Sequence, residues 1–168
     1  MRTRSIDSYG TDVPREGRVL VLGLGNEILR DDGVGLRAAR RVAERASGRV
    51  DLAEACVATI DLLSVLKGYD RVVVIDAYVS RDSPPGTAVR ATPEDLPRGF
   101  GYRSFHTLPF REMLELGRAI GWPMPREISI HGLSVEDASS FGTELTPRLA
   151  ATWQRWADDI ARTELGSE

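Results

Sequence analysis

The chain has 168 residues, 42% of them hydrophobic, and a formal net charge of −3 at pH 7. This length and composition suit one domain with a sizeable core, and the slightly acidic charge argues against a nucleic-acid partner. A single cysteine, Cys56, excludes a disulfide within the chain. No stretch approaches the roughly 18 apolar residues of a membrane span, so we expect a cytoplasmic protein.

Residues 1–16 differ in character from the rest of the chain. They are polar and charged, contain glycine and proline, and show no hydrophobic periodicity. Such a segment predicts a flexible N-terminal extension. We expect residues 17–168 to form a single α/β domain, because no internal repeat or second hydrophobic unit is visible.

The first half of the predicted domain alternates strand and helix. Strands are expected at residues 18–23, 50–57 and 71–76, with helices at 33–46 and 60–67 between them. The unbroken β-branched run at 71–76 is typical of a central parallel strand buried on both faces. Right-handed crossovers place the second and third strands on opposite sides of the first, as in a doubly wound sheet.

The second half predicts a fourth strand at residues 86–91, a helix at 107–120 and a last strand at 127–131. The connector before the fourth strand is too short for a parallel crossover, so this strand should be antiparallel. The final helix should begin at Pro147, with Thr146 as its N-cap. The fold class is therefore a three-layer α/β/α sandwich with a mixed, mostly parallel five-stranded sheet and one antiparallel strand.

Three polar residues are expected at one crevice. Ligands of open parallel sheets bind beyond the carboxyl ends of the strands, where the strand order reverses. Asp32 lies in the loop after the first strand, and Asp76 ends the third. The helix at 107–120 must run back towards the amino edge, so His106 at its N-terminus should reach the same place. A helix N-terminus disfavours imidazolium, which leaves His106 neutral and able to bind metal.

Two carboxylates and one imidazole suit a divalent ion such as nickel, zinc or manganese. Each residue also has an ordinary structural interpretation. Asp32 could cap the following helix, Asp76 could accept loop amides, and His106 could face solvent. Their coincidence at one crevice favours a metal site with open coordination positions.

Other features of the sequence receive ordinary interpretations. The segment Gly23-Leu-Gly25 begins like a dinucleotide-binding loop, but Ile28 replaces the third glycine and two aspartates follow. Cys56 is expected to be a small buried core residue at the end of a strand. His131 ends the last predicted strand, and burial or a backbone hydrogen bond is expected in preference to metal contact.

The segment from Gly23 to Gly35, Gly-Leu-Gly-Asn-Glu-Ile-Leu-Arg-Asp-Asp-Gly-Val-Gly, resembles the signature of the hydrogenase maturation proteases. The resemblance covers nearly everything from Arg18 onwards. It continues through four shorter motifs in the same order: Val74-Ile-Asp76-Ala77, Pro85-Gly-Thr87, Ser104-Phe-His106 and Leu145-Thr-Pro147.

The resemblance implies an endopeptidase in which Asp32, Asp76 and His106 are the catalytic and metal-contacting residues. Its implied task is to remove a C-terminal extension from the large-subunit precursor of a [NiFe] hydrogenase. The nickel would be supplied by that substrate, and no organic cofactor is implied. We expect a monomer without membrane contact.

One departure from the family pattern leaves alternatives open. Family members often carry Gly-Thr-x-Gly after the second strand, where this chain reads Cys56-Val-Ala-Thr59. The missing glycines would limit the close approach of a partner backbone. The chain could instead be a non-cleaving, nickel-dependent checkpoint protein for hydrogenase assembly, or another metal-dependent hydrolase on the same fold.

Overall fold

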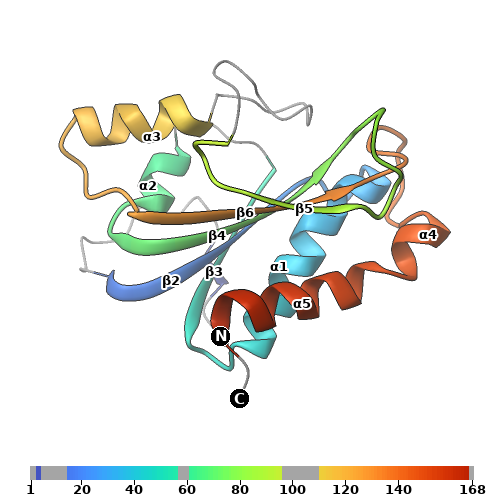
Figure 1. Ribbon diagram of the computed structural model, residues 1–168, viewed down its shortest axis with the longest axis horizontal. Helices are drawn as coiled ribbons and strands as arrows, with labels where there is room; N and C mark the ends of the chain where they lie inside the picture. The colour runs from blue at the N-terminus through green and yellow to red at the C-terminus, as the bar shows by residue number, and fades with distance from the viewer. Residues whose placement is uncertain (1–2, 5–14, 57–60, 96–109, 167–168) are drawn as a thin grey trace.

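A twisted sheet forms the centre of the computed structural model, which describes residues 3–4, 15–56, 61–95 and 110–166 (Figure 1). The strand order is β1-β3-β2-β4-β6-β5. The strands are β1 (Thr3–Arg4), β2 (Arg15–Leu24), β3 (Val50–Ala55), β4 (Tyr69–Tyr78), β5 (Ala88–Ala91) and β6 (Glu127–Ser134). All neighbours pair in parallel except β5, which runs antiparallel to β6.

Helices cover both faces of this sheet and make three layers, as predicted (Figure 1). One face carries α1 and α5, and the other carries α2 and α3. The helical elements are the 3₁₀ turn η1 (Arg30–Gly33), α1 (Val34–Arg45), α2 (Leu62–Leu66), α3 (Phe110–Ala119), α4 (Pro147–Ala150) and α5 (Trp153–Leu165).

The predicted topology of the main sheet is confirmed. The local order β3-β2-β4 places the second and third predicted strands on either side of the first, and β4 lies between β2 and β6. The short strand β1 extends the sheet beside β3. Residues 1–2 and 5–14 lie outside the described residues, so the division at residue 16 stays a prediction.

Side-chain alternation along β4 sorts its residues between two cores. Val73 and Ile75 pack with α1 and α5, whereas Val72 and Val74 pack with α2 and α3. Because successive strand residues point to opposite faces, Asp76 follows Val72 and Val74 and faces the α2–α3 side. The strand pattern thus puts a carboxylate on the face that α3 covers.

Two predicted boundaries change in the structure. β6 continues to Ser134, so His131 lies within the strand and not at its end. The final helix is divided into α4 and α5, because the Thr152 hydroxyl donates to the carbonyls of Arg148 and Leu149 at the junction. Such side-chain bonds compete with the helical backbone pattern.

The expectation that Cys56 is a buried core residue is wrong, since its side chain is exposed. β3 ends at Ala55, which is buried, and the next residue already points away from the core. The following positions, 57–60, lie outside the described residues. They include most of the segment in which the family glycines are missing.

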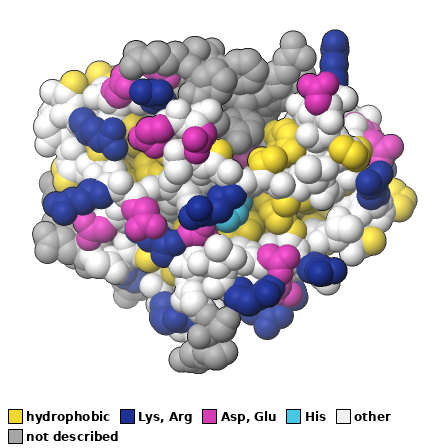
Figure 2. Space-filling model, viewed as in Figure 1, with side chains coloured by type: hydrophobic (Ala, Val, Ile, Leu, Met, Phe, Trp, Pro, Cys, Tyr) yellow, Lys and Arg dark blue, Asp and Glu magenta, His cyan; other side chains and the backbone are white. Residues whose placement is uncertain are grey.

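The surface drawn in Figure 2 mixes charges of both signs. Its hydrophobic side chains gather around β5 and the adjoining part of β6. None of the described helices is long and apolar enough to cross a membrane.

Candidate active site

Asp76 is a buried carboxylic acid near the carboxyl end of β4. Its side chain accepts the N–H of Ala77 at 2.8 Å, and the residue is 4% exposed. The pKa of Asp76 is raised to about 7, chiefly by burial; the Ala77 amide opposes the rise and the negative charge of Asp32 adds to it. A carboxyl group with a pKa near neutrality is characteristic of functional sites.

Asp32 approaches from η1, directly after β2. It is also buried, and its Oδ2 accepts the N–H of Asn26 at 2.7 Å. η1 contacts β4, which carries Asp76, and the negative charge of Asp32 raises the pKa of Asp76. Two of the three predicted site residues therefore converge at the carboxyl edge.

Glycines allow this close convergence. Gly25 has a φ of +139°, and a side chain there would collide with the backbone of Asp32. Gly35 lies in the first turn of α1, where a side chain would collide with the carbonyl oxygen of Leu24 and crowd that of Ile75. These glycines let the loop and helix pack directly on the ends of β2 and β4.

His106 lies outside the described residues, so its place in the site stays a prediction. α3, which follows it, lies on the same sheet face as Asp76 and runs opposite to β6 (Figure 1). Its N-terminal end is therefore the end nearer the carboxyl edge. Within the described part of the chain, no three His, Cys, Asp or Glu side chains gather into a metal-binding group.

Comparison with known proteins identifies the family. The family model described as hydrogenase maturation protease matches residues 34–163. This chain belongs to the hydrogenase maturation protease family. Membership confirms the resemblance carried by Gly23 to Gly35, although the matched region begins at the end of that segment.

Named relatives extend this result. The hydrogenase expression/formation protein HupD of Thiocapsa roseopersicina is 32% identical over 135 residues, covering 78% of this chain and 60% of that protein. The chain thus spans less than two thirds of that relative's length. The hydrogenase 2 maturation protease of Escherichia coli is 29% identical over 137 residues, covering 80% of this chain and 82% of that protein.

A solved structure confirms the fold. The hydrogenase maturating endopeptidase HybD of Escherichia coli superposes with a TM-score of 0.71 and 26% identity, covering 89% of this chain and 94% of that chain. These relatives are named as a hydrogenase expression/formation protein, a hydrogenase maturation protease and a hydrogenase maturating endopeptidase. Membership in this family therefore disfavours the non-cleaving checkpoint protein and the unrelated hydrolase.

Asp31 has a structural role in this family member that the sequence did not reveal. It is fully buried, and its carboxylate accepts the backbone N–H groups of Asp137 and Thr146 at 3.0 and 2.7 Å. The Thr146 hydroxyl also donates to it at 3.0 Å. Thr146 occupies the predicted N-cap position of α4, but its hydroxyl bonds Asp31 and not the helix. The two adjacent aspartates thus have different roles: Asp31 holds the loop in place, and Asp32 belongs to the candidate active site.

His131 belongs to a different buried group. Its Nε2 lies 2.7 Å from Oε1 of Glu164 in α5, on the sheet face opposite Asp76. Burial lowers the pKa of His131, the Glu164 bond opposes this, and the charges of Arg90 and Arg71 lower it further. The neutral ring therefore donates to Glu164. The predicted burial is confirmed, but the partner is a side-chain carboxylate and not the backbone.

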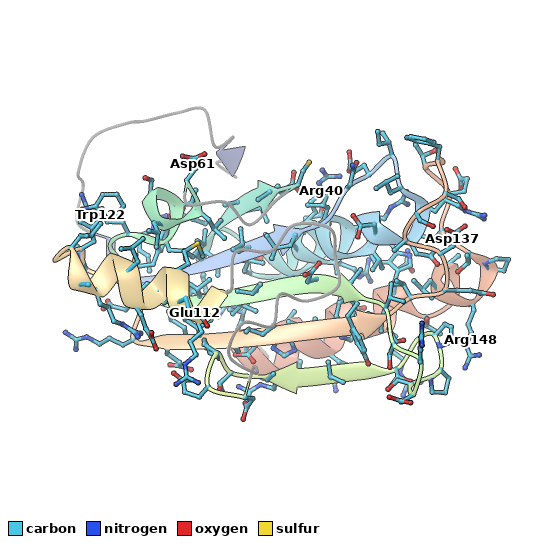
Figure 3. All side chains as sticks on the ribbon, turned by 90° about the horizontal axis from the view of Figure 1, so that it is seen from above. Arg40, Asp61, Glu112, Trp122, Asp137 and Arg148 are labelled. Atoms are coloured by element: carbon cyan, nitrogen blue, oxygen red, sulfur yellow. The ribbon has the colours of Figure 1, made fainter. Side chains whose placement is uncertain are left out.

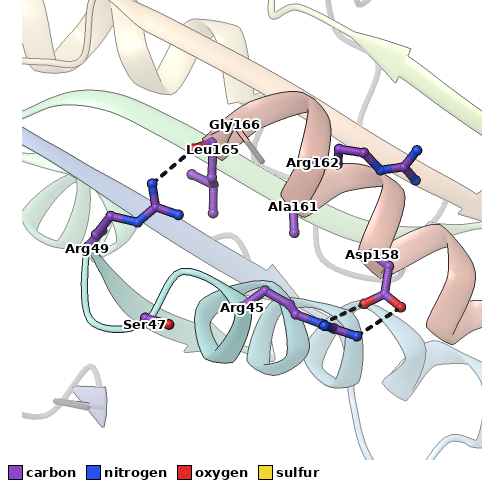
Figure 4. Close-up of a pocket in the computed structure, with 8 residues that line it drawn as sticks. All are labelled: Arg45, Ser47, Arg49, Asp158, Ala161, Arg162, Leu165 and Gly166. Carbon is purple, nitrogen blue, oxygen red and sulfur yellow. Dashed lines mark hydrogen bonds and ion pairs between the residues drawn. The ribbon is translucent and has the colours of Figure 1, made fainter. Parts of the chain in front are cut away.

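A cavity of about 530 Å³ lies between the C-terminal ends of α1 and α5, away from the two aspartates (Figure 4). Two of its arginines link α5 to α1 and to the turn that follows α1. Arg45 pairs with Asp158 at 3.1 Å, and Arg49 donates to the carbonyl of Leu165 at 3.3 Å. The full lining is Arg45, Ser47, Arg49, Asp158, Ala161, Arg162, Leu165 and Gly166. It contains no residue of the candidate active site.

Proposed function

We propose that this protein is an endopeptidase that removes the C-terminal extension from the large-subunit precursor of a [NiFe] hydrogenase. The observation that carries the proposal is the buried pair Asp32 and Asp76, with the pKa of Asp76 raised to about 7. Family membership supports the reaction class, peptide-bond hydrolysis.

The electrostatics of the pair favour a cationic substrate group. Two neighbouring carboxylates in a poorly hydrated place disfavour double ionisation. A divalent ion relieves both the repulsion and the burial cost, because it supplies positive charge to both oxygens. We therefore assign Asp32, Asp76 and His106 as contacts for nickel carried by the precursor.

Nickel bound by the precursor would offer a Lewis acid beside the scissile carbonyl. The protein's contribution is then to position that ion. Asp32 is held by Asn26 and Asp76 by Ala77, so both carboxylates are oriented before the substrate arrives. Such preorganisation limits the reorganisation needed at the moment of reaction.

The remaining expectations belong to the same proposal. The protein should act as a monomer in the cytoplasm, without a resident organic cofactor. Residues 17–168 should suffice as the peptidase domain, with residues 1–16 as a flexible extension.

The test is mass spectrometry of the precursor after incubation with the purified protein. Precursor loaded with nickel should lose its C-terminal extension, and nickel-free precursor should remain intact. His106→Ala should lose activity on the loaded precursor. Equal cleavage of loaded and nickel-free precursor would remove nickel as the recognised group, and cleavage of neither would remove the proposed reaction.

A further inference from the structure

Arg30, which directly precedes the two buried aspartates, has an unusual backbone conformation. Its φ is +41°, in the left-handed region that a residue with a Cβ atom disfavours. Among the described residues, Ser47 is the other non-glycine residue with a positive φ, and it follows α1, where a left-handed residue commonly ends a helix. Arg30 has no such helix end to explain it, so its conformation depends on the contacts that surround it.

Contacts from the segment that follows β6 hold Arg30. Its N–H donates to the carbonyl of Gly142 at 2.7 Å. Its guanidinium Nη1 lies 3.3 Å from Oδ2 of Asp137, and its Nε donates to the carbonyl of Glu144 at 3.4 Å. Both the backbone and the side chain of Arg30 are therefore bound to one segment, residues 137–144, which we call the β6 loop.

Asp137 binds the neighbouring aspartate as well as Arg30. It lies at the end of the molecule opposite Trp122 (Figure 3). Its carbonyl accepts the N–H of Asp31 at 3.1 Å, and its own N–H donates to the Asp31 carboxylate at 3.0 Å. Its carboxylate also accepts the N–H of Ser140 at 2.9 Å, which fixes the β6 loop. Arg30 thus has a partner that is itself held in place.

The position of Asp32 depends on the same turn. The N–H of Asp32 donates to the carbonyl of Leu29 at 2.9 Å, so Arg30 lies inside the turn that carries this carboxylate. Oδ2 of Asp32 accepts the N–H of Asn26 at 2.7 Å. A change in the backbone angles of Arg30 would rotate the following peptide units and displace Asp32 from this bond.

We propose that Arg30 is a positioning residue, whose guanidinium bonds to the β6 loop keep the Asp32 carboxylate in the orientation that the reaction requires. This inference rests on the proposed function, since it explains how that site is held together. Arg30 acts through Asp32 and not on the substrate. A misplacement of about 1 Å can lower a reaction rate on the order of 100-fold, so a looser turn should have a measurable effect on cleavage.

The test compares Arg30→Ala with the matched control Arg41→Ala. Arg41 of α1 pairs with Asp158 of α5 at 2.8 Å, and the side chains of Arg30 and Arg41 are similarly exposed, at 35% and 27%. Each variant loses the ion pair of one arginine, but only Arg30 lies in the turn of Asp32. Alanine keeps the Cβ atom, so Arg30→Ala retains the cost of the positive φ and removes the side-chain bonds alone.

Amide hydrogen exchange followed by NMR reports on Asp32 without any substrate. The N–H of Asn26, which donates to Asp32, should exchange about tenfold faster in Arg30→Ala than in wild type, and Arg41→Ala should leave it unchanged. The N–H of Val73, in the centre of β4, should keep its protection in Arg30→Ala. Adding Asp137→Ala to Arg30→Ala should increase Asn26 exchange little beyond Asp137→Ala alone, because the two residues form one pair.

Cleavage of nickel-loaded precursor gives the functional measurement. At a temperature where all variants are folded, kcat should fall about tenfold in Arg30→Ala and stay within about twofold of wild type in Arg41→Ala. Arg30→Lys keeps the positive charge for Asp137 but loses the fork of donors, so it should recover part of the loss.

Unchanged exchange at Asn26 in Arg30→Ala, or an equal rise at Asn26 and Val73, overturns the positioning role. Normal kcat in Arg30→Ala beside faster exchange at Asn26 overturns it too. If the wild-type protein fails to cleave, the proposed reaction falls, while exchange at Asn26 still decides whether Arg30 positions Asp32.

Discussion

Asp76 and Glu164 are both buried carboxylic acids, but their surroundings are opposite. Asp76 has a like charge nearby, Asp32, and burial raises its pKa to about 7. Burial would also raise the pKa of Glu164, but bonds from His131 and Arg90 and the charge of Arg71 hold it below its ordinary value. Glu164 also lies on the sheet face opposite the site.

This difference in surroundings distinguishes a carboxylate that stabilises the fold, Glu164, from one in the candidate active site, Asp76. Glu164 is compensated by cations and a histidine from three strands, so α5 is tied to the sheet by a satisfied charge. At the carboxyl edge, burial and the negative charge of Asp32 instead raise the pKa of Asp76, so an arriving cation would favour the ionised form of this pair. Four substitutions or conditions can break or sharpen this contrast.

The largest expected effect is on cleavage by Asp76→Asn. An amide is a poor replacement for an anionic ligand, so processing of nickel-loaded precursor should fall at least about 100-fold. The folded state should be retained, because the burial cost of a charge is removed. Mass spectrometry measures the cleavage, with Asp159→Asn at an exposed position of α5 as the control. Near-normal processing by Asp76→Asn would show that the pair is not the reaction centre.

Glu164→Ala should act on stability instead. Removing the carboxylate leaves Arg71, Arg90 and His131 without their shared partner, at a cost of roughly 3–5 kcal/mol in the free energy of unfolding. Urea denaturation measures this loss. The control Asp159→Ala breaks an exposed pair with Arg162 and should cost less than about 1 kcal/mol. A similarly small loss for Glu164→Ala would contradict the contrast.

The pH dependence of stability should show the two acids with opposite signs. The folded-state pKa of Asp76 is raised from 3.8 to about 7, so its stabilising contribution is present below pH 4 and lost as pH rises through 7. That loss is at most about 4 kcal/mol. Glu164, with a lowered pKa, contributes stability above its ordinary value and loses it in acid. Denaturation measured from acid to neutral pH should show that Asp76→Asn removes the loss of stability towards pH 7 and keeps the loss in acid that comes from Glu164. An unchanged profile would refute the raised pKa.

The smallest effect is expected from Thr146→Val. Asp31 is a third buried carboxylate, but backbone amides satisfy it, so loss of one hydroxyl bond should cost about 1 kcal/mol. Thermal unfolding measures the change, and the Thr143→Val variant of an exposed neighbour serves as control. Cleavage should stay within about twofold of wild type. A severe loss of cleavage would give the Thr146 hydroxyl a direct part in the reaction.

Local sequence patterns were enough to predict the sheet and the positions of Asp32 and Asp76 at its carboxyl edge. The β-branched run before Asp76 identified a central strand, and the short connector before Ala88 identified the antiparallel strand. Both are properties of neighbouring residues. Topology then brought Asp32 and Asp76 to one edge without any knowledge of side-chain contacts.

The surroundings of Glu164 could not be predicted in this way, because they depend on contacts between residues far apart in the sequence. His131 and Glu164 are 33 residues apart, and Arg71 is 93 residues from Glu164. Nothing in the sequence marks them as partners. The same limitation hid the role of Asp31, whose partners lie 106 and 115 positions further along the chain. The exposure of Cys56 depended on a strand boundary, which periodicity does not fix to one residue.

The bonds of Asp31 also bear on how the protein is made. This residue follows the first long strand, yet it bonds amides 106 and 115 positions further along the chain. A nascent chain that has not yet emerged as far as Thr146 lacks the amides that hold Asp31 in place. Contacts of such long sequence separation are entropically costly and form late in folding. We therefore expect the final arrangement of the buried aspartates to form only after the segment around Thr146 has been synthesised, when most of the sheet has assembled.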